Sequence, residues 1–274
     1  MSRTWLITGS SAGFGQALAR AALAAGDNVV ASARRVEALD SLVATAPDRA
    51  LAVGLDVTDR RQVTAAAAAA TDRFGAIDVL VNNAGLASVG AVEELRDAEL
   101  RMLMDTMYFG PLAMVQAVLP GMRDRGRGTI VQMSSMGGQV SMPGFGAYCA
   151  AKFALEALSE ALAAEVAPYG VRVLIVEPGA FATSFGGGRA QVSPDSGLYD
   201  QTVGSQRAAV AGMDGSQPGD PDKAAATILE ALDAPHAPLR LALGTDAVTY
   251  IGSTLDARRA ELDAWAALSR STDR

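Results

Sequence analysis

The amino-acid sequence predicts one doubly wound α/β domain, in which helices cover both faces of a parallel sheet. Three observations lead to this prediction. Short runs that are apolar throughout recur along the chain, as expected for strands buried on both faces. Alanine-rich stretches of helical period separate these runs. The first apolar run leads directly into a glycine-rich turn, TGSSAGFG at residues 8–15.

Taken in order, the apolar runs predict seven strands, at 4–8, 28–33, 50–55, 78–82, 129–133, 171–176 and 239–243. The intervening segments predict helices at about 14–25, 61–74, 94–118, 147–167 and 221–233, with a last amphipathic helix near 246–268. All 274 residues are assigned to one domain, with a C-terminal extension from about 238 to 274. One stretch, at about 184–220, is rich in Gly, Ser and Pro and breaks the alternation. It follows the end of a strand, where ligands bind in such sheets, so we expect a substrate lid; a disordered excursion is the alternative.

Charge and composition exclude several classes of function. The net charge is −7 and the 23 Lys and Arg residues form no cationic block, so neither nucleic acid nor an anionic membrane is an expected partner. One cysteine, Cys149, and one histidine, His236, are too few for a zinc or haem site, and no metal is expected. With no signal peptide and no long uncharged apolar run evident, a cytoplasmic protein is expected.

The glycine-rich turn indicates a phosphate ligand. Gly9, Gly13 and Gly15 lie between the first strand and the first helix, together with Ser11 and Phe14. Glycines allow backbone N–H groups to approach a phosphate, and the helix N-terminus adds partial positive charge. The sequence therefore predicts that a dinucleotide pyrophosphate binds here, although glycines at such a turn can also serve packing alone.

The end of the second strand bears on which dinucleotide binds. A site for NAD commonly carries an acidic residue there, but this chain has Ala33 followed by Arg34 and Arg35. A carboxylate would repel a 2′-phosphate, whereas an arginine can bind one through two hydrogen bonds. We therefore predict NADP(H) in preference to NAD(H); the alternative is that both arginines belong to a solvated helix start.

Further motifs follow in a fixed order, and together they resemble the short-chain dehydrogenase/reductase family over residues 4 to about 183. They are Asp56 and Val57 in LDVTD, Asn83, Ala84 and Gly85 in NNAG, Ser135 in QMSSMGG, Tyr148 and Lys152 in YCAAK, and Pro178, Gly179, Phe181 and Thr183 in EPGAFAT. The resemblance implies a single-domain Rossmann fold and a cofactor site that includes these residues. It also implies catalysis by Ser135, Tyr148 and Lys152. Ser134 is the neighbouring candidate, but Ser135 stands thirteen residues before Tyr148, a spacing common in the family.

The Tyr148 and Lys152 pair can also be argued from physics. Reduction of a ketone leaves an alkoxide that needs a proton, and the reverse reaction needs that proton removed. A free tyrosine titrates near pH 10, so work near pH 7 requires about 4 kcal/mol. A lysine ammonium about 4 Å away supplies energy on the order of 4 kcal/mol at an effective dielectric near 20. Residues four apart on a helix are neighbours, so Lys152 is expected to lower the pKa of Tyr148. The alternative is a half-buried tyrosine and an unrelated surface lysine.

One position departs from the family pattern. The family commonly has an asparagine three residues before the glycine that is Gly110 here, and this chain has Met107. In the family that asparagine helps to hold a water that connects the lysine to solvent, and a thioether is only a weak acceptor. Three outcomes remain open: a backbone carbonyl holds the water, Thr106 or Tyr108 substitutes, or catalysis is impaired.

The expected substrate is a hydrophobic ketone or secondary alcohol, because the side chains expected to face it are apolar or aromatic. Besides Ser135 and Tyr148 they are Met142, Phe145, Phe181 and Phe185, with Met136 and Tyr199 as further candidates if the lid folds inward. The alternative is that several of them are ordinary core residues. The resemblance also implies a homodimer or homotetramer built on the helix that carries Tyr148. A regulator that binds the dinucleotide without turnover, or a non-redox epimerase or dehydratase, is the alternative function.

Overall fold

The computed structural model describes residues 2–183, 190–213 and 215–274 and has the predicted doubly wound architecture. Seven parallel strands form one sheet in the order β3-β2-β1-β4-β6-β7-β9. They are β1 (Thr4–Ile7), β2 (Asn28–Ala33), β3 (Ala50–Gly54), β4 (Val79–Asn82), β6 (Gly128–Met133), β7 (Val171–Pro178) and β9 (Arg240–Leu243). The prediction of a parallel Rossmann-type sheet is confirmed, and every predicted strand is present within two residues.

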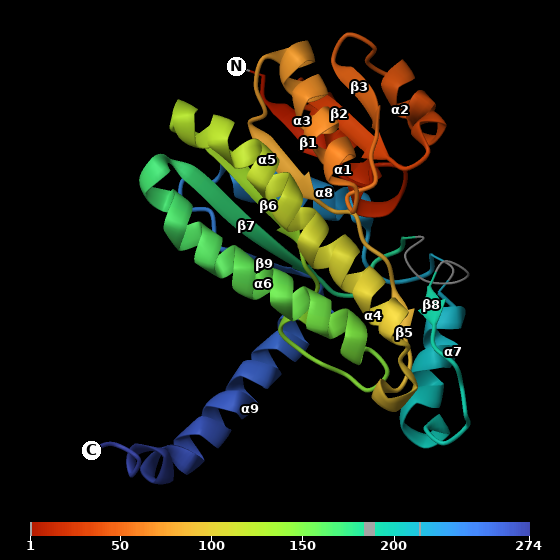
Figure 1. The fold of residues 1–274 in the computed structure, drawn as a ribbon, viewed down its shortest axis with the longest axis vertical. Coiled ribbons are helices and arrows are strands. Elements are labelled where there is room, and N and C mark those ends of the chain that lie inside the picture. The colour runs from red at the N-terminus through yellow and green to blue at the C-terminus, as the bar shows by residue number, and fades with distance from the viewer. Residues whose placement is uncertain (1, 184–189, 214) are drawn as a thin grey trace.

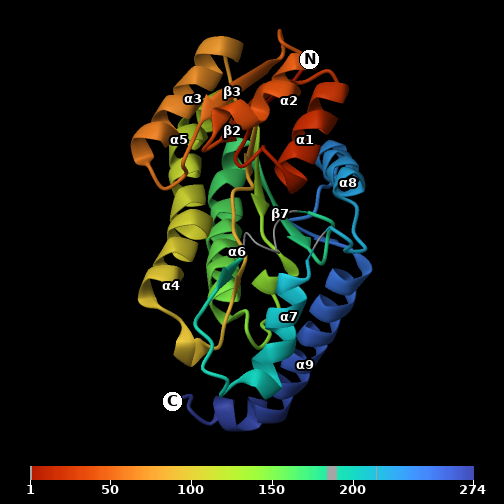
Figure 2. The ribbon, with the colours of Figure 1, turned by 90° about the vertical axis from the view of Figure 1, so that its right-hand side faces the viewer.

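Helices cover both faces of this sheet and bury its apolar side chains in two cores (Figures 1 and 2). One core lies under α1 (Gly13–Ala24), the short α2 (Asp40–Ala44) and α8 (Pro221–Asp233). The other lies under α3 (Arg60–Phe74), α5 (Gly110–Arg125) and α6 (Gly146–Val166). Because the strands are buried on both faces, they read as continuous apolar runs in the sequence.

The helix predicted over 94–118 is interrupted. It consists of α4 (Asp97–Met104), a π-helical turn over Asp105–Phe109, and α5. The N–H of Gly110 donates to the carbonyl of Asp105, five residues earlier. A wider turn of this kind inserts one residue into the helix and is frequent at functional sites. Helical periodicity does not reveal it, because apolar residues continue on both sides.

The stretch from Asp97 to Arg125 has the length and mean hydropathy of a membrane span. The sequence expectation concerned uncharged apolar runs, and this stretch contains charged residues, among them Asp105 and Arg123. Its inward-facing side chains nevertheless belong to the domain core, with Leu103, Met107, Met114 and Met122 fully buried. Helices buried in the core of a globular domain commonly have this composition.

The remaining elements lie at the end of the sheet where its strands finish. A small sheet pairs β5 (Ser88–Val89) in parallel with β8 (Gln191–Val192), and α7 (Ser205–Ala211) follows. The last helix, α9 (Thr245–Arg270), begins beside β9 and projects from the body of the domain (Figure 1).

Candidate active site and dinucleotide site

Most of the predicted site residues lie at one edge of the sheet, past the carboxyl ends of its strands. Thr8 follows β1, Asn83 follows β4, Ser134 follows β6 and Gly179 follows β7. The strand order changes direction between β1 and β4, which makes this the edge where α/β sheets bind ligands.

Ser135, Tyr148 and Lys152 converge at this edge. Tyr148 and Lys152 lie one turn apart on α6, with Lys152 Nζ 5.8 Å from the centre of the Tyr148 ring. Ser135 precedes a short 3₁₀ turn and is hydrogen bonded to Tyr148 through its side chain. Its Oγ also accepts the N–H of Gly137 at 3.0 Å and lies 3.5 Å from the carbonyl of Pro178. Side chains from two segments thirteen residues apart therefore meet where a substrate oxygen would be held.

The protonation of the pair differs from the sequence expectation. Burial raises the pKa of Tyr148 to about 12, against a smaller lowering by the hydrogen bond to Ser135. Burial lowers the pKa of Lys152 to about 8, opposed by the charge of Glu156. The net shift of the phenol pKa is therefore upward, whereas the sequence predicts a lowering, because desolvation is its largest cause. Lys152 is only 5 % exposed, and its Nζ donates to the carbonyl of Met133 at 2.7 Å.

The structure distinguishes the two adjacent serines. Ser134 Oγ donates to Glu156 Oε1 at 2.7 Å and is buried, pointing away from Tyr148. Ser135 is partly exposed and is the serine bonded to Tyr148. Two consecutive residues in extended backbone point to opposite sides, so only one of them can face the site.

The glycine turn is closely packed. Gly9 and Gly13 have φ of 70° and 57°, a region that favours glycine. A Cβ on Gly15 would lie 2.4 Å from the carbonyl oxygen of Gly9 and 2.5 Å from Asn83 Nδ2.

The N-cap of α1, Ala12, has no side-chain hydrogen bond, and the first turn has no acidic residue. By contrast, Asp59 caps α3 and Asp220 caps α8. The first N–H groups of α1 therefore fit an anionic ligand such as a pyrophosphate.

Asn83 and Thr8 hold this turn from the neighbouring strands. Asn83 Nδ2 donates to the carbonyls of Thr8 at 2.8 Å and Gly9 at 3.1 Å. Thr8 Oγ1 accepts the N–H groups of Asn83 at 2.9 Å and Ala84 at 3.0 Å. Asn83 thus acts through its side chain on the glycine turn. Thr8 was missed, although it is the first residue of the glycine motif.

The residues expected near the adenosine lie at the ends of β2 and β3. Arg34 and Arg35 are exposed, and neither side chain has an ion pair or hydrogen bond within the described ranges. Asp56 binds the N–H and the hydroxyl of Thr58 through Oδ1. Val57 is buried against Gly110, where a Cβ would come within 2.8 Å of its side chain, so only its backbone can face a ligand.

The segment after β7 packs against both the turn and α9. Gly179 has no room for a side chain, because a Cβ would lie 2.1 Å from Asp246 Oδ1, and Asp246 Oδ2 accepts the N–H of Ala180 at 2.7 Å. The rings of Phe181 and Phe14 are 5.0 Å apart. A Cβ on Gly13 would lie 3.3 Å from that of Thr183. Phe181 therefore belongs to the glycine-turn side of the site.

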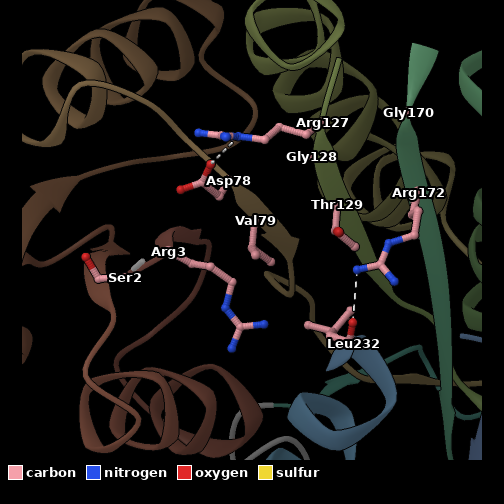
Figure 3. Close-up of a pocket in the computed structure, with 10 residues that line it drawn as sticks. All are labelled: Ser2, Arg3, Asp78, Val79, Arg127, Gly128, Thr129, Gly170, Arg172 and Leu232. Atoms are coloured by element: carbon pink, nitrogen blue, oxygen red, sulfur yellow. Dashed lines mark hydrogen bonds and ion pairs between the residues drawn. The ribbon is translucent and has the colours of Figure 1, made fainter. Parts of the chain in front are cut away.

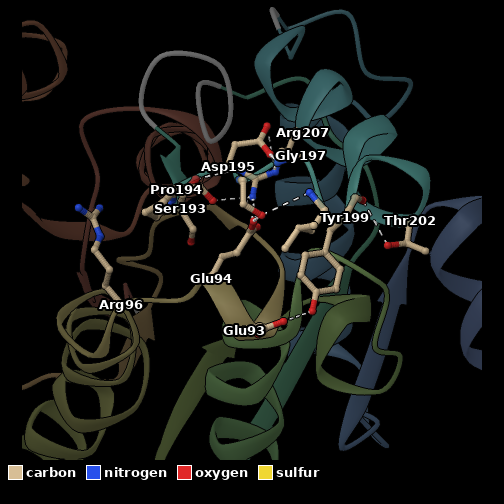
Figure 4. A network of polar contacts seen from close by, with 12 residues as sticks. Glu93, Glu94, Arg96, Ser193, Pro194, Asp195, Gly197, Tyr199, Thr202 and Arg207 are labelled. Carbon is tan, nitrogen blue, oxygen red and sulfur yellow. Dashed lines mark hydrogen bonds and ion pairs between the residues drawn. The ribbon is translucent and has the colours of Figure 1, made fainter.

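The residues expected at the substrate end are only partly described. Met142, Phe145 and Met136 are partly buried around the start of α6. The hydroxyl of Tyr199 donates a hydrogen bond to the carboxylate of Glu93 (Figure 4). Phe185 lies outside the described residues.

Met107 packs among apolar side chains beside Tyr148. It is fully buried in the π-helical turn and clusters with Leu103, Ala147 and Ala151, with Tyr148 packed against them. Its sulfur would be 3.5 Å from a Cβ on Gly85. The methionine thus fills the space between Gly85 and α6 by apolar packing. Its sulfur has no hydrogen bond within the described residues.

The segment that carries β8 and α7 is joined to the start of α4 by a polar network (Figure 4). Arg207 Nη2 donates to Glu94 Oε2 at 2.7 Å, and both side chains are about one-tenth exposed. Arg207 also donates to the carbonyls of Ser193 and Pro194. The Arg207–Glu94 ion pair therefore anchors this part of the segment, which the sequence predicts to be a lid.

A separate cavity of about 390 Å³ lies at the opposite edge of the sheet (Figure 3). Three arginines line it, but each has a protein partner: Arg3 binds Asp27 and Asp233, Arg172 binds the carbonyl of Leu232, and Arg127 lies 4.0 Å from Asp78. None of the predicted site residues borders it.

Comparison with known proteins agrees with this geometry. Residues 3–191 match the family model described as short chain dehydrogenase. The oxidoreductase BOA17 of Botryotinia fuckeliana is 40% identical over 270 residues, which is 98% of each chain. A crystal structure of a short-chain dehydrogenase from Streptomyces avermitilis has 54% identity and a TM-score of 0.94, with all of both chains covered.

Solved relatives with a cofactor are more distant. A short-chain dehydrogenase from Burkholderia cenocepacia in complex with NADP is 29% identical, with a TM-score of 0.74 and 96% of each chain covered. A reductase from Brucella melitensis is complexed with NADH instead, at 26% identity, a TM-score of 0.73, and 88% of this chain and 96% of that chain covered. Both forms of the dinucleotide thus occur among the relatives.

Proposed function

As a member of the short-chain dehydrogenase family, this chain is an oxidoreductase that binds NAD or NADP, and we propose that it uses NADP(H) to interconvert a hydrophobic ketone and its secondary alcohol. The observation that carries the proposal is the meeting of Ser135, Tyr148 and Lys152 at the ligand-binding edge of the sheet.

Each of the three side chains has a distinct role. The hydroxyl of Ser135 donates to the substrate oxygen, and Tyr148 gives its proton to that oxygen in reduction or takes it in oxidation. Lys152 stabilises the phenolate and binds the nicotinamide ribose. The dinucleotide supplies or accepts the hydride when bound.

The preference for NADP(H) rests on Arg34 and Arg35. Both follow β2, are exposed and have no partner in the described part of the chain. Two unpaired guanidinium groups suit a 2′-phosphate, and no carboxylate stands at Ala33 to repel it.

The proposal is tested by cofactor consumption with purified protein and a panel of hydrophobic ketones, with NADPH and NADH in parallel. We expect NADPH oxidation to exceed NADH oxidation. We also expect the double substitution Arg34→Ser and Arg35→Ser to raise KM for NADPH at least about tenfold, the loss of about 1.4 kcal/mol of binding, with little change for NADH. Equal use of both cofactors by the wild type would contradict the NADP preference. Tight binding without turnover would favour a regulator or a non-redox reaction.

Met107 offers a separate test of the proton route. Because the thioether cannot hold a water as the family asparagine does, Met107→Asn is expected to raise the rate of proton-limited steps about twofold to tenfold. The measurement is the solvent deuterium isotope effect on ketone reduction, with Met107→Leu as the control that keeps the position apolar. If the wild type turns over with no solvent isotope effect, and Met107→Asn reduces the ketone at the same rate, then proton supply does not limit the rate of turnover.

A further inference from the structure

Helix α6 carries a line of four ionisable side chains, each four residues after the last: Tyr148, Lys152, Glu156 and Glu160. The first two belong to the catalytic set, and Glu160 is exposed at the other end. Glu156, the residue directly beyond Lys152, is only 3 % exposed. A buried carboxylate of this kind requires compensating partners, because burial of an isolated charge is costly.

Glu156 has these partners on both oxygens. Oε1 accepts from Ser134 Oγ at 2.7 Å, and Oε2 accepts from Gln139 Nε2 at 2.7 Å and from Arg240 Nε at 3.0 Å. Gly138 makes room for the arrangement, since a Cβ there would lie 2.5 Å from Ser134 Oγ and 2.6 Å from Glu156 Oε1. Three hydrogen-bond donors thus compensate the burial of this carboxylate.

A second buried carboxyl faces the first. Glu177 on β7 is 2 % exposed, and Arg240 Nε lies 3.5 Å from its Oε1. That oxygen has no hydrogen-bond partner in the described parts of the chain. Burial and the nearby charge of Glu156 raise the pKa of Glu177 to about 7. Two carboxyl groups that share one arginine do not both ionise easily, so below pH 7 Glu177 carries a proton.

Lys152 lies one helical turn before Glu156 on α6, and its ammonium is buried. The hydrogen bond that Nζ donates to the carbonyl of Met133 involves a neutral acceptor. Glu156 is the charged group that opposes the loss of the lysine proton. The other charged groups facing the pair are Arg240 from β9, which reduces its negative potential, and Glu160, which binds Arg240 Nη2 at 3.1 Å. Gln139 and Ser134 contribute only neutral donors.

We propose that Glu156 and Glu177 form a buried carboxyl pair that keeps the ammonium of Lys152 protonated, so that both are positioning residues for hydride transfer. This inference rests on the proposed function for the role of Lys152. Glu156 places its carboxylate one helical turn beyond the lysine. Glu177 adds a second charge only as the pH rises.

The direction of the effect follows from the sign of the charge that Glu177 acquires when it ionises. Burial raises the pKa of Glu177 to about 7 and lowers that of Lys152 to about 8, so the two groups titrate in the same pH range. The new negative charge favours the ammonium, so it moves the loss of the lysine proton to higher pH. The pair therefore extends the pH range over which Lys152 can support Tyr148.

The chain contains two lysines, Lys152 and Lys223, which allows a direct measurement. Protein labelled with [¹³C]lysine gives two ¹³Cε signals by NMR, and exposed Lys223 serves as the internal reference. We expect Glu156→Gln to lower the apparent pKa of Lys152 by about one unit, and Glu177→Gln to lower it by about half a unit. The matched control Glu160→Gln removes an exposed charge from the same line and is expected to leave the value unchanged.

Activity provides a second, independent readout. The alkaline limb of the pH profile for alcohol oxidation is expected to shift to lower pH in both buried variants and to stay in place in Glu160→Gln. An unchanged Lys152 titration in Glu156→Gln and Glu177→Gln would overturn the inference even in an active enzyme. A protein with no turnover but with the expected lysine shifts would instead overturn the proposed function alone. If Glu156→Gln fails to fold, Glu177→Gln still decides the question.

Discussion

Replacement of Tyr148 by phenylalanine is expected to lower the rate of hydride transfer about 10²- to 10⁴-fold, the contribution typical of a positioned general acid. The substitution removes only the hydroxyl that exchanges a proton with the substrate oxygen. The ring remains to pack against Met107 and its neighbours. Cofactor affinity is therefore expected to stay within about twofold, because the glycine turn and Lys152 are untouched. Single-turnover NADPH oxidation and NADPH fluorescence titration measure the two quantities.

The matched control is Tyr169→Phe, the same chemical change at an exposed tyrosine beyond α6. It is expected to leave both quantities unchanged. Comparable loss in the two variants would point to a structural effect, and a fully active Tyr148→Phe would contradict the assignment of the proton donor.

The pH dependence of the wild type tests the same residue. Since burial raises the pKa of Tyr148 to about 12, the phenol is protonated throughout the neutral range. Ketone reduction uses this proton. The protonation state of Tyr148 is therefore not expected to limit the rate of reduction at any pH below about 8. Alcohol oxidation requires the phenolate and is expected to accelerate as the pH rises until Lys152 loses its charge.

The second large effect is expected at Gly15. In Gly15→Ala the new Cβ would be placed 2.4 Å from the carbonyl oxygen of Gly9 and 2.5 Å from Asn83 Nδ2, so the backbone of the turn must move. Overpacking of this kind costs about 1–3 kcal/mol of the free energy of unfolding. Movement of the turn also displaces the N–H groups expected to bind the pyrophosphate, so dinucleotide affinity is expected to fall at least about tenfold.

Chemical denaturation and NADPH titration measure these two losses. Gly54→Ala on β3 is the control, because a Cβ there meets no atom within 4 Å. A Gly15→Ala protein that binds NADPH like the wild type would show that the turn can relax without consequence, contrary to its proposed role.

The fold was largely predictable because its signals are local and periodic. All seven strands were expected from runs that are apolar throughout, and the helices between them from their alanine-rich pattern. The π-helical turn at Asp105–Phe109 was not predictable in this way. It depends on a single carbonyl bonding five residues ahead instead of four, and both choices leave the same apolar pattern.

The candidate site was predictable where one segment carries the whole signal. The glycine turn and the spacing of Tyr148 and Lys152 each lie within fifteen residues of sequence. The choice between Ser134 and Ser135 needed the structure, because both hydroxyls have the same chemistry and only backbone direction separates them. The upward shift of the Tyr148 pKa also needed it, since its largest cause is the exclusion of water by surrounding segments.

The sequence by itself determined the order of strands and helices, the glycine turn and the identity of the chemical groups, since these depend on residue type and short-range spacing. Only the tertiary structure decided which groups meet. Glu156, Glu177 and Arg240 come from α6, β7 and β9, as many as 84 residues apart, and form one buried charge cluster behind Lys152. No local pattern records such a contact, because it arises when the parallel sheet places its strand ends beside α6 and excludes water from the space between them.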